Sequence, residues 1–181
     1  MKLKSVCVFC GSNNNASPRF LDLATELGKE LSQRKIQMVY GGGDVGMMGK
    51  AANAMLQNGG EVIGIIPEHL MKREVAHKGV QTLHVVPNMH ERKQMMFDLS
   101  DGFICLPGGF GTLDEFMEVV TWKVLDLHDK PIVLANLDRF FDSLISWIET
   151  ANRNGFIYPC STELYHVVPD IPGIFDYFDS I

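Results

Sequence analysis

The feature that most constrains this chain is residues 106–115 (LPGGFGTLDE), which join an apolar run to an amphipathic one. Residues 102–106 (GFICL) have the composition of a buried strand. After the glycines, apolar residues recur at the three- and four-residue spacings of a helix, at Leu113, Phe116, Met117, Val120 and Val124. The pattern therefore predicts a strand, a tight turn and the start of a helix.

A turn of this kind is suited to binding an anion. The first N–H groups of a helix have no intrahelical partner and carry the positive end of its dipole. Gly108, Gly109 and Gly111 allow a ligand to approach the backbone without Cβ hindrance. We expect a phosphate here, with the carboxylate of Glu115, one turn further in, facing the sugar of the same ligand. The alternative is a purely structural turn, since turn geometry and the dipole favour these residues without any ligand.

Strands and helices alternate along the whole sequence. The expected strands are residues 6–9, 36–40, 61–67, 83–86, 102–106, 132–135 and 165–168. Between them we expect helices that begin at Pro18, follow residues 41–49, cover 89–99, run from 113 to about 128, cover 138–154 and form a short tail within 169–181. This order predicts an α/β fold, a doubly wound (Rossmann-like) parallel sheet with helices on both faces. No repeat or low-complexity linker divides residues 1–181, so we expect a single domain.

A second glycine-rich turn, residues 41–49 (GGGDVGMMG), follows the second expected strand. Its glycines at 41, 43 and 46 satisfy the dinucleotide fingerprint, but that fingerprint normally follows the first strand of its unit. Glu61 also comes earlier than the acidic residue expected about 20 positions on. A P-loop is excluded because Ala51 stands where a hydroxyl side chain should bind magnesium. A dinucleotide site is therefore the less favoured alternative.

Four segments of the predicted fold meet at one edge of the sheet. Doubly wound sheets bind ligands at the carboxyl ends of their strands, where both glycine-rich turns and the loop around Ser12 lie. The start of the helix 89–99 lies there too, and Arg92 and Lys93 are near its positive end, where cations gain nothing from the dipole. A functional role explains that placement, although a solvated arginine is the alternative. The arrangement predicts a site for a phosphorylated nucleotide.

Charge and cysteine content restrict partners and compartment. The formal charge of −6 argues against a general nucleic-acid or anionic-membrane binder. A secretory signal and an apolar stretch of membrane-spanning length are both lacking, so we expect a cytoplasmic protein. The four cysteines are too few and scattered for a disulfide framework, and the Cys7-x-x-Cys10 pair faces opposite sides of a strand that continues through it. We expect buried strand cysteines rather than a redox or zinc site.

Residues 107–115 (PGGFGTLDE) resemble the PGGxGTxxE motif of the LOG (Lonely Guy) family, the cytokinin riboside 5'-monophosphate phosphoribohydrolases. Further similarity covers nearly the whole chain, at residues 9–12 (FCGS), 40–43 (YGGG), 46–49 (GMMG), 89–93 (MHERK), 121–122 (TW) and 128–131 (HDKP). The resemblance implies hydrolysis of the N-glycosidic bond of adenosine-type nucleoside 5'-monophosphates, AMP or N6-prenyl-AMP. The products are the free base and ribose 5-phosphate.

The resemblance also implies roles for individual residues. It assigns catalysis to Glu115 and Arg92. It makes the substrate site from Glu74, Arg92, Lys93, Gly108, Gly109, Phe110, Gly111, Thr112, Leu113, Asp114 and Thr121. Ser12, Gly42 and Gly43 are further candidates at the same edge of the sheet. The chemistry needs no metal or cofactor, because a carboxylate can stabilise oxocarbenium charge on the ribose and orient a water, while an arginine holds the phosphate or that carboxylate.

Members of the family are usually homodimers with the active site near the subunit contact. Three positions depart from the family pattern: Val124 stands where many relatives have Gln, Asp126 where they have Gly, and Asp114 where Glu is usual. These departures leave the implied reaction intact. They bear on the dimer contact or on the preference among bases.

Two other classes of function stay open at this point. The same fold and loops serve molybdenum-cofactor carriers, which bind a phosphate-bearing pterin without cleaving it. A lysine decarboxylase would need a lysine that forms a Schiff base with pyridoxal phosphate. Neither Lys50 nor Lys93 has a recognisable context for that cofactor.

Overall fold

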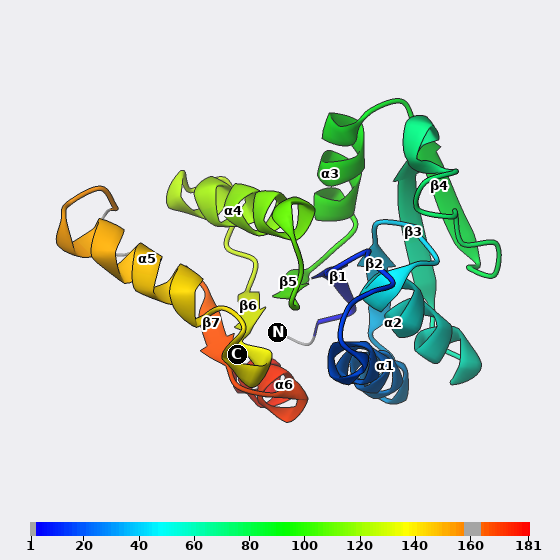
Figure 1. Ribbon diagram of the computed structural model, residues 1–181, viewed down its shortest axis with the longest axis horizontal. Helices are drawn as coiled ribbons and strands as arrows, with labels where there is room; N and C mark the ends of the chain where they lie inside the picture. The colour runs from blue at the N-terminus through cyan, green and yellow to red at the C-terminus, as the bar shows by residue number, and fades with distance from the viewer. Residues whose placement is uncertain (1–2, 158–163) are drawn as a thin grey trace.

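The computed structural model describes residues 3–157 and 164–181, so Cys160 lies outside the described residues. The described residues form a seven-stranded sheet in the order β4-β3-β2-β1-β5-β6-β7 (Figure 1). Every strand pair is parallel. The strands are β1 (Ser5–Phe9), β2 (Gln37–Tyr40), β3 (Val62–Pro67), β4 (Thr82–Val86), β5 (Gly102–Cys105), β6 (Ile132–Ala135) and β7 (His166–Val168).

The helices cover both faces of this sheet. They are α1 (Pro18–Gln33), α2 (Gly46–Gln57), α3 (Met89–Asp98), α4 (Phe110–Val124), α5 (Asp142–Arg153) and α6 (Ile171–Ser180). Figure 1 shows α1, α2 and α6 on one side of the sheet and α3, α4 and α5 on the other. Two separate apolar clusters of buried side chains match these two layers. The predicted doubly wound parallel α/β fold is confirmed.

The central strands are buried along their whole length because both of their faces are covered. All residues of β1 and β5 are buried, as parallel sheets between two helical layers require. Cys7 packs in the cluster on the α4 side and Cys10 in the cluster on the α1 side. The prediction that these two cysteines face opposite sides is therefore confirmed, and both are free thiols.

Strand order reverses around β1, which lies between β2 and β5. The chain leaves β1 toward α1 on one face and leaves β5 toward α4 on the other face. In doubly wound sheets this switch point opens a crevice at the carboxyl ends of the strands. The first and the central loops of the chain, after Phe9 and after Cys105, both start there.

Helix boundaries differ from the predicted ones near α5. The predicted helix 138–154 begins only at Asp142, after the short 3-10 helix η2 (Leu137–Arg139). Asp138 and Arg139 have left-handed φ values of 52° and 62°, which a continuous helix cannot contain. Asn136 fixes this corner, since its Oδ1 accepts from the N–H of Phe141 at 2.7 Å. The apolar pattern runs through the corner and gives no sign of it.

Other boundaries depend on caps. Asn88 caps α3, with its side chain accepting from the N–H of Glu91 at 3.0 Å. Ser17 precedes Pro18 at the start of α1, but its side chain makes no capping hydrogen bond. The helix α4 begins at Phe110, three residues earlier than its apolar stripe suggests, and ends at Val124 rather than near 128. A second 3-10 turn, η1 (Glu68–Leu70), follows β3.

No helix in the described ranges has both the length and the apolar character needed to cross a membrane.

Candidate active site

Three loops at the carboxyl edge are bonded to one another. The N–H of Gly11, after β1, donates to the carbonyl oxygen of Pro107, after β5, at 3.0 Å. The carbonyl of Gly11 in turn accepts from Met47, in the first turn of α2, at 2.9 Å. Asn14 adds a side-chain bond, accepting from the N–H of Gly46 at 2.8 Å. The predicted meeting of both glycine-rich turns with the loop around Ser12 is therefore confirmed.

The glycine turn before α4 is open on its outer side. No side chain caps the start of α4, so the first N–H groups of the helix remain available. A Cβ at Gly109 or at Gly111 would meet no atom within 4 Å. Gly108 is packed instead: a Cβ there would lie 2.1 Å from Thr112 Oγ1 and 3.0 Å from the backbone N of Gly11. The turn is thus packed against the protein at Gly108, and its backbone is open to solvent at Gly109 and Gly111.

Arg92 is a buried cation at this edge. It lies in the first turns of α3 and is 4% exposed. Its Nη2 donates to the carbonyl oxygen of Gly41 at 2.8 Å and to Glu74 Oε2 at 3.1 Å. Its Nε, also buried, has no hydrogen-bond partner among the described residues. The alternative of a solvated arginine is therefore wrong. Glu74 supplies the counter-charge that a buried guanidinium needs, and the second glycine turn supplies a hydrogen-bond acceptor.

Glu115 lies in the second turn of α4 and is half-buried. Burial raises the pKa of its carboxyl to about 7, with Glu74 and Asp114 acting in the same direction and Arg92 and Lys93 against it. In the described ranges no hydrogen bond or ion pair engages this carboxyl. It borders a small cavity between α3 and α4, lined by Phe9, Lys93, Phe97, Glu115, Glu118 and Val119. An unpaired carboxyl with a raised pKa in a crevice is typical of an acid–base or charge-stabilising group.

Lys93 connects α3 to α4. Its Nζ lies 3.1 Å from Asp114 Oδ2 and 3.0 Å from Glu118 Oε1. Burial lowers the pKa of this ammonium, but the bonds to Glu118 and Asp114 outweigh burial and the pKa is raised. A Schiff-base lysine must lose its proton readily, so Lys93 is poorly suited to that chemistry. Lys50 is exposed on α2.

The remaining predicted residues are spread over the same edge and over α4. Gly42 has a φ of +76°, and a Cβ at Gly43 would lie 2.9 Å from the carbonyl oxygen of Glu74. Thr112 is buried beneath Gly108, whereas Phe110 is 94% exposed. Thr121 is exposed and lies about 9 Å along the axis of α4 from Glu115, given a rise of about 1.5 Å per residue. Within one chain, Thr121 is therefore apart from the other residues of the site.

Sequence reasoning missed two contributors to this site. Glu118 shares Lys93 with Asp114, and its spacing of four residues from Asp114 on one helix was a usable signal. Gly41 acts through its carbonyl oxygen, and a backbone contact of this kind leaves no signal in the sequence beyond the glycine itself.

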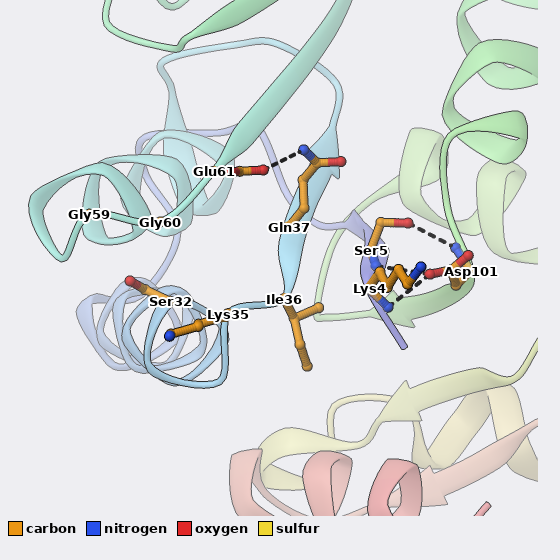
Figure 2. Close-up of a pocket in the computed structure, with 10 residues that line it drawn as sticks. All are labelled: Lys4, Ser5, Ser32, Lys35, Ile36, Gln37, Gly59, Gly60, Glu61 and Asp101. Atoms are coloured by element: carbon orange, nitrogen blue, oxygen red, sulfur yellow. Dashed lines mark hydrogen bonds between the residues drawn. The ribbon is translucent and has the colours of Figure 1, made fainter. Parts of the chain in front are cut away.

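A larger hollow of about 630 Å³ lies at the opposite edge of the sheet (Figure 2). It is lined by Lys4, Ser5, Ser32, Lys35, Ile36, Gln37, Gly59, Gly60, Glu61 and Asp101, near the amino ends of β1, β2 and β5. Its polar groups bond one another, as when Asp101 Oδ2 accepts from the backbone N of Lys4 at 2.8 Å. Because ligands of doubly wound sheets bind at the carboxyl edge, we assign the site to the glycine turns and not to this hollow.

No group of three or more His, Cys, Asp or Glu side chains in residues 3–157 and 164–181 is placed to hold a metal ion.

Solved structures with the same fold include molybdenum-cofactor proteins. The molybdenum cofactor binding protein of Rippkaea orientalis matches with a TM-score of 0.74 at 22% identity, covering 99% of this chain and 98% of that one. The Moco carrier protein of Chlamydomonas reinhardtii matches with a TM-score of 0.72 at 20% identity, covering 97% and 95%. At this level of identity the likeness concerns the fold alone.

Sequence relatives are much more similar. A cytokinin riboside 5'-monophosphate phosphoribohydrolase of Rhodococcoides fascians is 47% identical over 171 residues, 94% of this chain and 86% of the relative. One of Arabidopsis thaliana is 46% identical over 168 residues, 93% and 78% of the two chains. A family profile described as "possible lysine decarboxylase" matches residues 48–178. Together with the open glycine turn beside Glu115, these matches identify the chain as a member of the LOG family of cytokinin riboside 5'-monophosphate phosphoribohydrolases.

Proposed function

We propose that this chain hydrolyses the N-glycosidic bond of adenosine-type nucleoside 5'-monophosphates, AMP or N6-prenyl-AMP, to the free base and ribose 5-phosphate. The observation that carries the proposal is the position of Glu115: an unpaired carboxyl with a pKa of about 7, one turn beyond an open anion-binding turn. Two relatives of this chain, at 46% and 47% identity, are named as phosphoribohydrolases, which supports the same reaction here.

The phosphate and ribose bind along the start of α4. The free N–H groups there, together with the unhindered backbone at Gly109 and Gly111, favour a phosphate. We assign substrate binding to Glu74, Arg92, Lys93, Thr121, Ser12, Gly42, Gly43 and residues 108–114. Specificity for a 5'-monophosphate over a nucleoside then follows from the anion at the helix start.

Glu115 and Arg92 carry the chemistry. Departure of the base develops positive charge on the ribose, which the carboxylate of Glu115 stabilises while it orients a water for attack. Arg92 is held by Gly41 and Glu74, and its unpartnered Nε–H can donate to the ligand. This fixed cation keeps the substrate aligned with Glu115, and alignment is a large part of such catalysis.

A homodimer would complete the site. Exposed apolar side chains occur on and just after α4 and α5, where Leu125 and Leu127 are 60% and 65% exposed and Trp147 is 59% exposed. Thr121 lies in the last turn of α4, just before these two leucines, and is exposed. A second copy packed against α4 would bury these side chains and bring Thr121 of one chain toward the site of the other. Light scattering after size-exclusion chromatography tests the dimer.

The remaining proposals concern the whole chain. We propose one domain over residues 1–181 and a cytoplasmic location, which the free buried thiols of Cys7, Cys10 and Cys105 favour. The formal charge of −6 disfavours nucleic acid and anionic membranes as partners.

The test is direct: incubate the protein with AMP, N6-prenyl-AMP and adenosine, and separate free base from nucleotide by chromatography. We expect base and ribose 5-phosphate from the monophosphates and none from adenosine, which lacks the phosphate. The competing function is a carrier of the same fold, as in the molybdenum-cofactor proteins. Tight retention of AMP with no free adenine would favour the carrier and overturn the hydrolase.

A further inference from the structure

The segment after η1 is attached to the second glycine turn by three backbone hydrogen bonds. The N–H of Asp44 donates to the carbonyl oxygens of Glu74 at 3.1 Å and Val75 at 2.8 Å. Gly43 and Ala76 form an isolated antiparallel bridge, and the N–H of His77 donates to the carbonyl oxygen of Gly42 at 2.9 Å. Residues 74–77 are therefore paired with residues 42–44, antiparallel, through backbone hydrogen bonds.

Val75 has a φ of +48°, a left-handed conformation that β-branched residues rarely adopt. Its side chain is 52% exposed, so burial of the side chain does not compensate for the strain. Such a conformation costs about 1–3 kcal/mol and persists only where neighbouring structure imposes it. The contacts on either side of Val75 must supply that constraint.

His77 is the anchor on the far side of Val75. Its side chain is 4% exposed, and its Nδ1 accepts from the N–H of Gly79 at 3.0 Å. Its buried Nε2 lies 3.6 Å from Asp44 Oδ1, too far for a hydrogen bond, and has no hydrogen-bond partner among the described residues. The same carboxylate oxygen of Asp44 accepts from Asn53 of α2 at 2.9 Å. The imidazole thus packs beside the carboxylate of Asp44, which joins the glycine turn to α2, while the backbone N–H of His77 makes the hydrogen bond to Gly42.

Glu74 lies on the other side of the strained residue Val75. Its carboxylate meets Arg92 Nη2 at 3.1 Å, and it precedes Val75 directly in the chain. If Val75 relaxed to a right-handed conformation, the backbone at Glu74 would change direction and the carboxylate would leave Arg92. The geometry of Arg92 therefore depends on whatever prevents that relaxation.

We propose that His77 is a positioning residue: it holds Val75 in its strained conformation and so keeps Glu74 on Arg92. The proposal rests on the proposed hydrolase function, in which Arg92 aligns the substrate. His77 itself touches neither the substrate nor the reacting atoms.

The experiment compares His77→Ala, Val75→Gly/His77→Ala and Val75→Ala/His77→Ala. His77→Ala should lower kcat for base release roughly 10- to 100-fold, since a displacement of about 1 Å in an aligning group costs that much. Adding Val75→Gly should restore most of the loss, because glycine adopts a positive φ without strain. Adding Val75→Ala is the matched control and should restore less, since alanine still has a Cβ.

Three results overturn the proposal: a parent-like kcat in His77→Ala, no rescue by Val75→Gly, or equal rescue by alanine. Should His77→Ala fail to fold, His77→Gln replaces it, because its amide retains much of the volume.

A crystal structure of each variant separates this proposal from the proposed function. Arg92 Nη2 and Glu74 Oε2 should part in His77→Ala and return to about the parent distance with Val75→Gly. This readout needs no activity. A parent without base release contradicts the hydrolase, whereas an intact ion pair in His77→Ala contradicts the role of His77.

Discussion

The guanidinium of Arg92 fills space that is free only because residue 41 is a glycine: a Cβ at Gly41 would lie 2.0 Å from Arg92 Nη2. The same nitrogen donates to the carbonyl oxygen of Gly41 at 2.8 Å. Gly41 thus contributes twice, through its missing side chain and through its carbonyl group. The second glycine turn, whose glycines match the dinucleotide fingerprint in the sequence, binds the buried guanidinium of Arg92 in this structure.

Gly41→Ala should therefore act on the site through Arg92. The new methyl group displaces the guanidinium, and a buried charge that loses a partner costs about 3–5 kcal/mol. We expect a lower melting temperature and a fall in kcat/KM for base release of roughly 100-fold. Thermal unfolding and a base-release assay measure both.

The control for this variant is the Arg92→Ala background. If Gly41→Ala acts through Arg92, adding it to Arg92→Ala should change activity little further. Parent-like activity of Gly41→Ala, or a full further loss in the double variant, would contradict this account.

The two types of glycine in the α4 turn should behave differently. In Gly111→Ala the new Cβ meets no atom within 4 Å, and alanine favours a helix more than glycine does. The melting temperature should therefore hold or rise. Its methyl group would intrude on a bound phosphate, so KM for AMP should increase. Gly108→Ala would strike Thr112 Oγ1 and should instead destabilise the fold. Unchanged KM in a stable Gly111→Ala would mean that the phosphate binds elsewhere.

The sheet and the meeting of the loops could be predicted from the sequence because they follow from periodicity and topology. Parallel strands joined by helices place every strand-to-helix turn at one edge, so residues 106–115 and 41–49 had to meet there. The left-handed corners at Val75 and Arg139 could not be predicted, because neither residue favours a positive φ. Tertiary contacts impose these conformations, and a tertiary contact likewise gives the buried Arg92 its partner, the carbonyl oxygen of Gly41.

Lys35 offers a test of backbone strain away from the site. It follows α1 with a φ of 58°, and the bonds from its N–H to Ser32 and from Ile36 to Leu31, both 3.0 Å, form a Schellman cap. Lys35→Gly should stabilise the fold by about 1 kcal/mol, because glycine pays no Cβ penalty there. Thermal unfolding should show a rise of about 2–4 °C. Lys35→Ala is the control and should give no such gain.

Glu115 should make base release depend on pH near neutrality. Burial raises the pKa of this carboxyl to about 7, so the carboxylate that we assign to catalysis forms as the pH rises through that value. In the free enzyme, kcat/KM should therefore increase from pH 5 to pH 8. Glu115→Gln should abolish base release and leave AMP binding largely intact. Release at the parent rate would remove Glu115 from the mechanism.

The same raised pKa predicts how the stability of the fold depends on pH. An unfolded glutamic acid titrates near 4.5 and the folded one near 7, so the folded state binds the proton more tightly. Its contribution to stability is full below about pH 4.5 and is lost as the pH rises through 7, by at most about 3.5 kcal/mol at about 1.4 kcal/mol per pKa unit. Glu115→Gln removes this titration, so the variant should gain melting temperature relative to the parent at pH 8 and little at pH 4.5. Glu118→Gln is the control, because the carboxylate of Glu118 is already paired with Lys93 and the variant should show no such gain at high pH. An equal effect of Glu115→Gln at both pH values would mean that the carboxyl is not held in the buried, unpaired state on which its proposed chemistry depends.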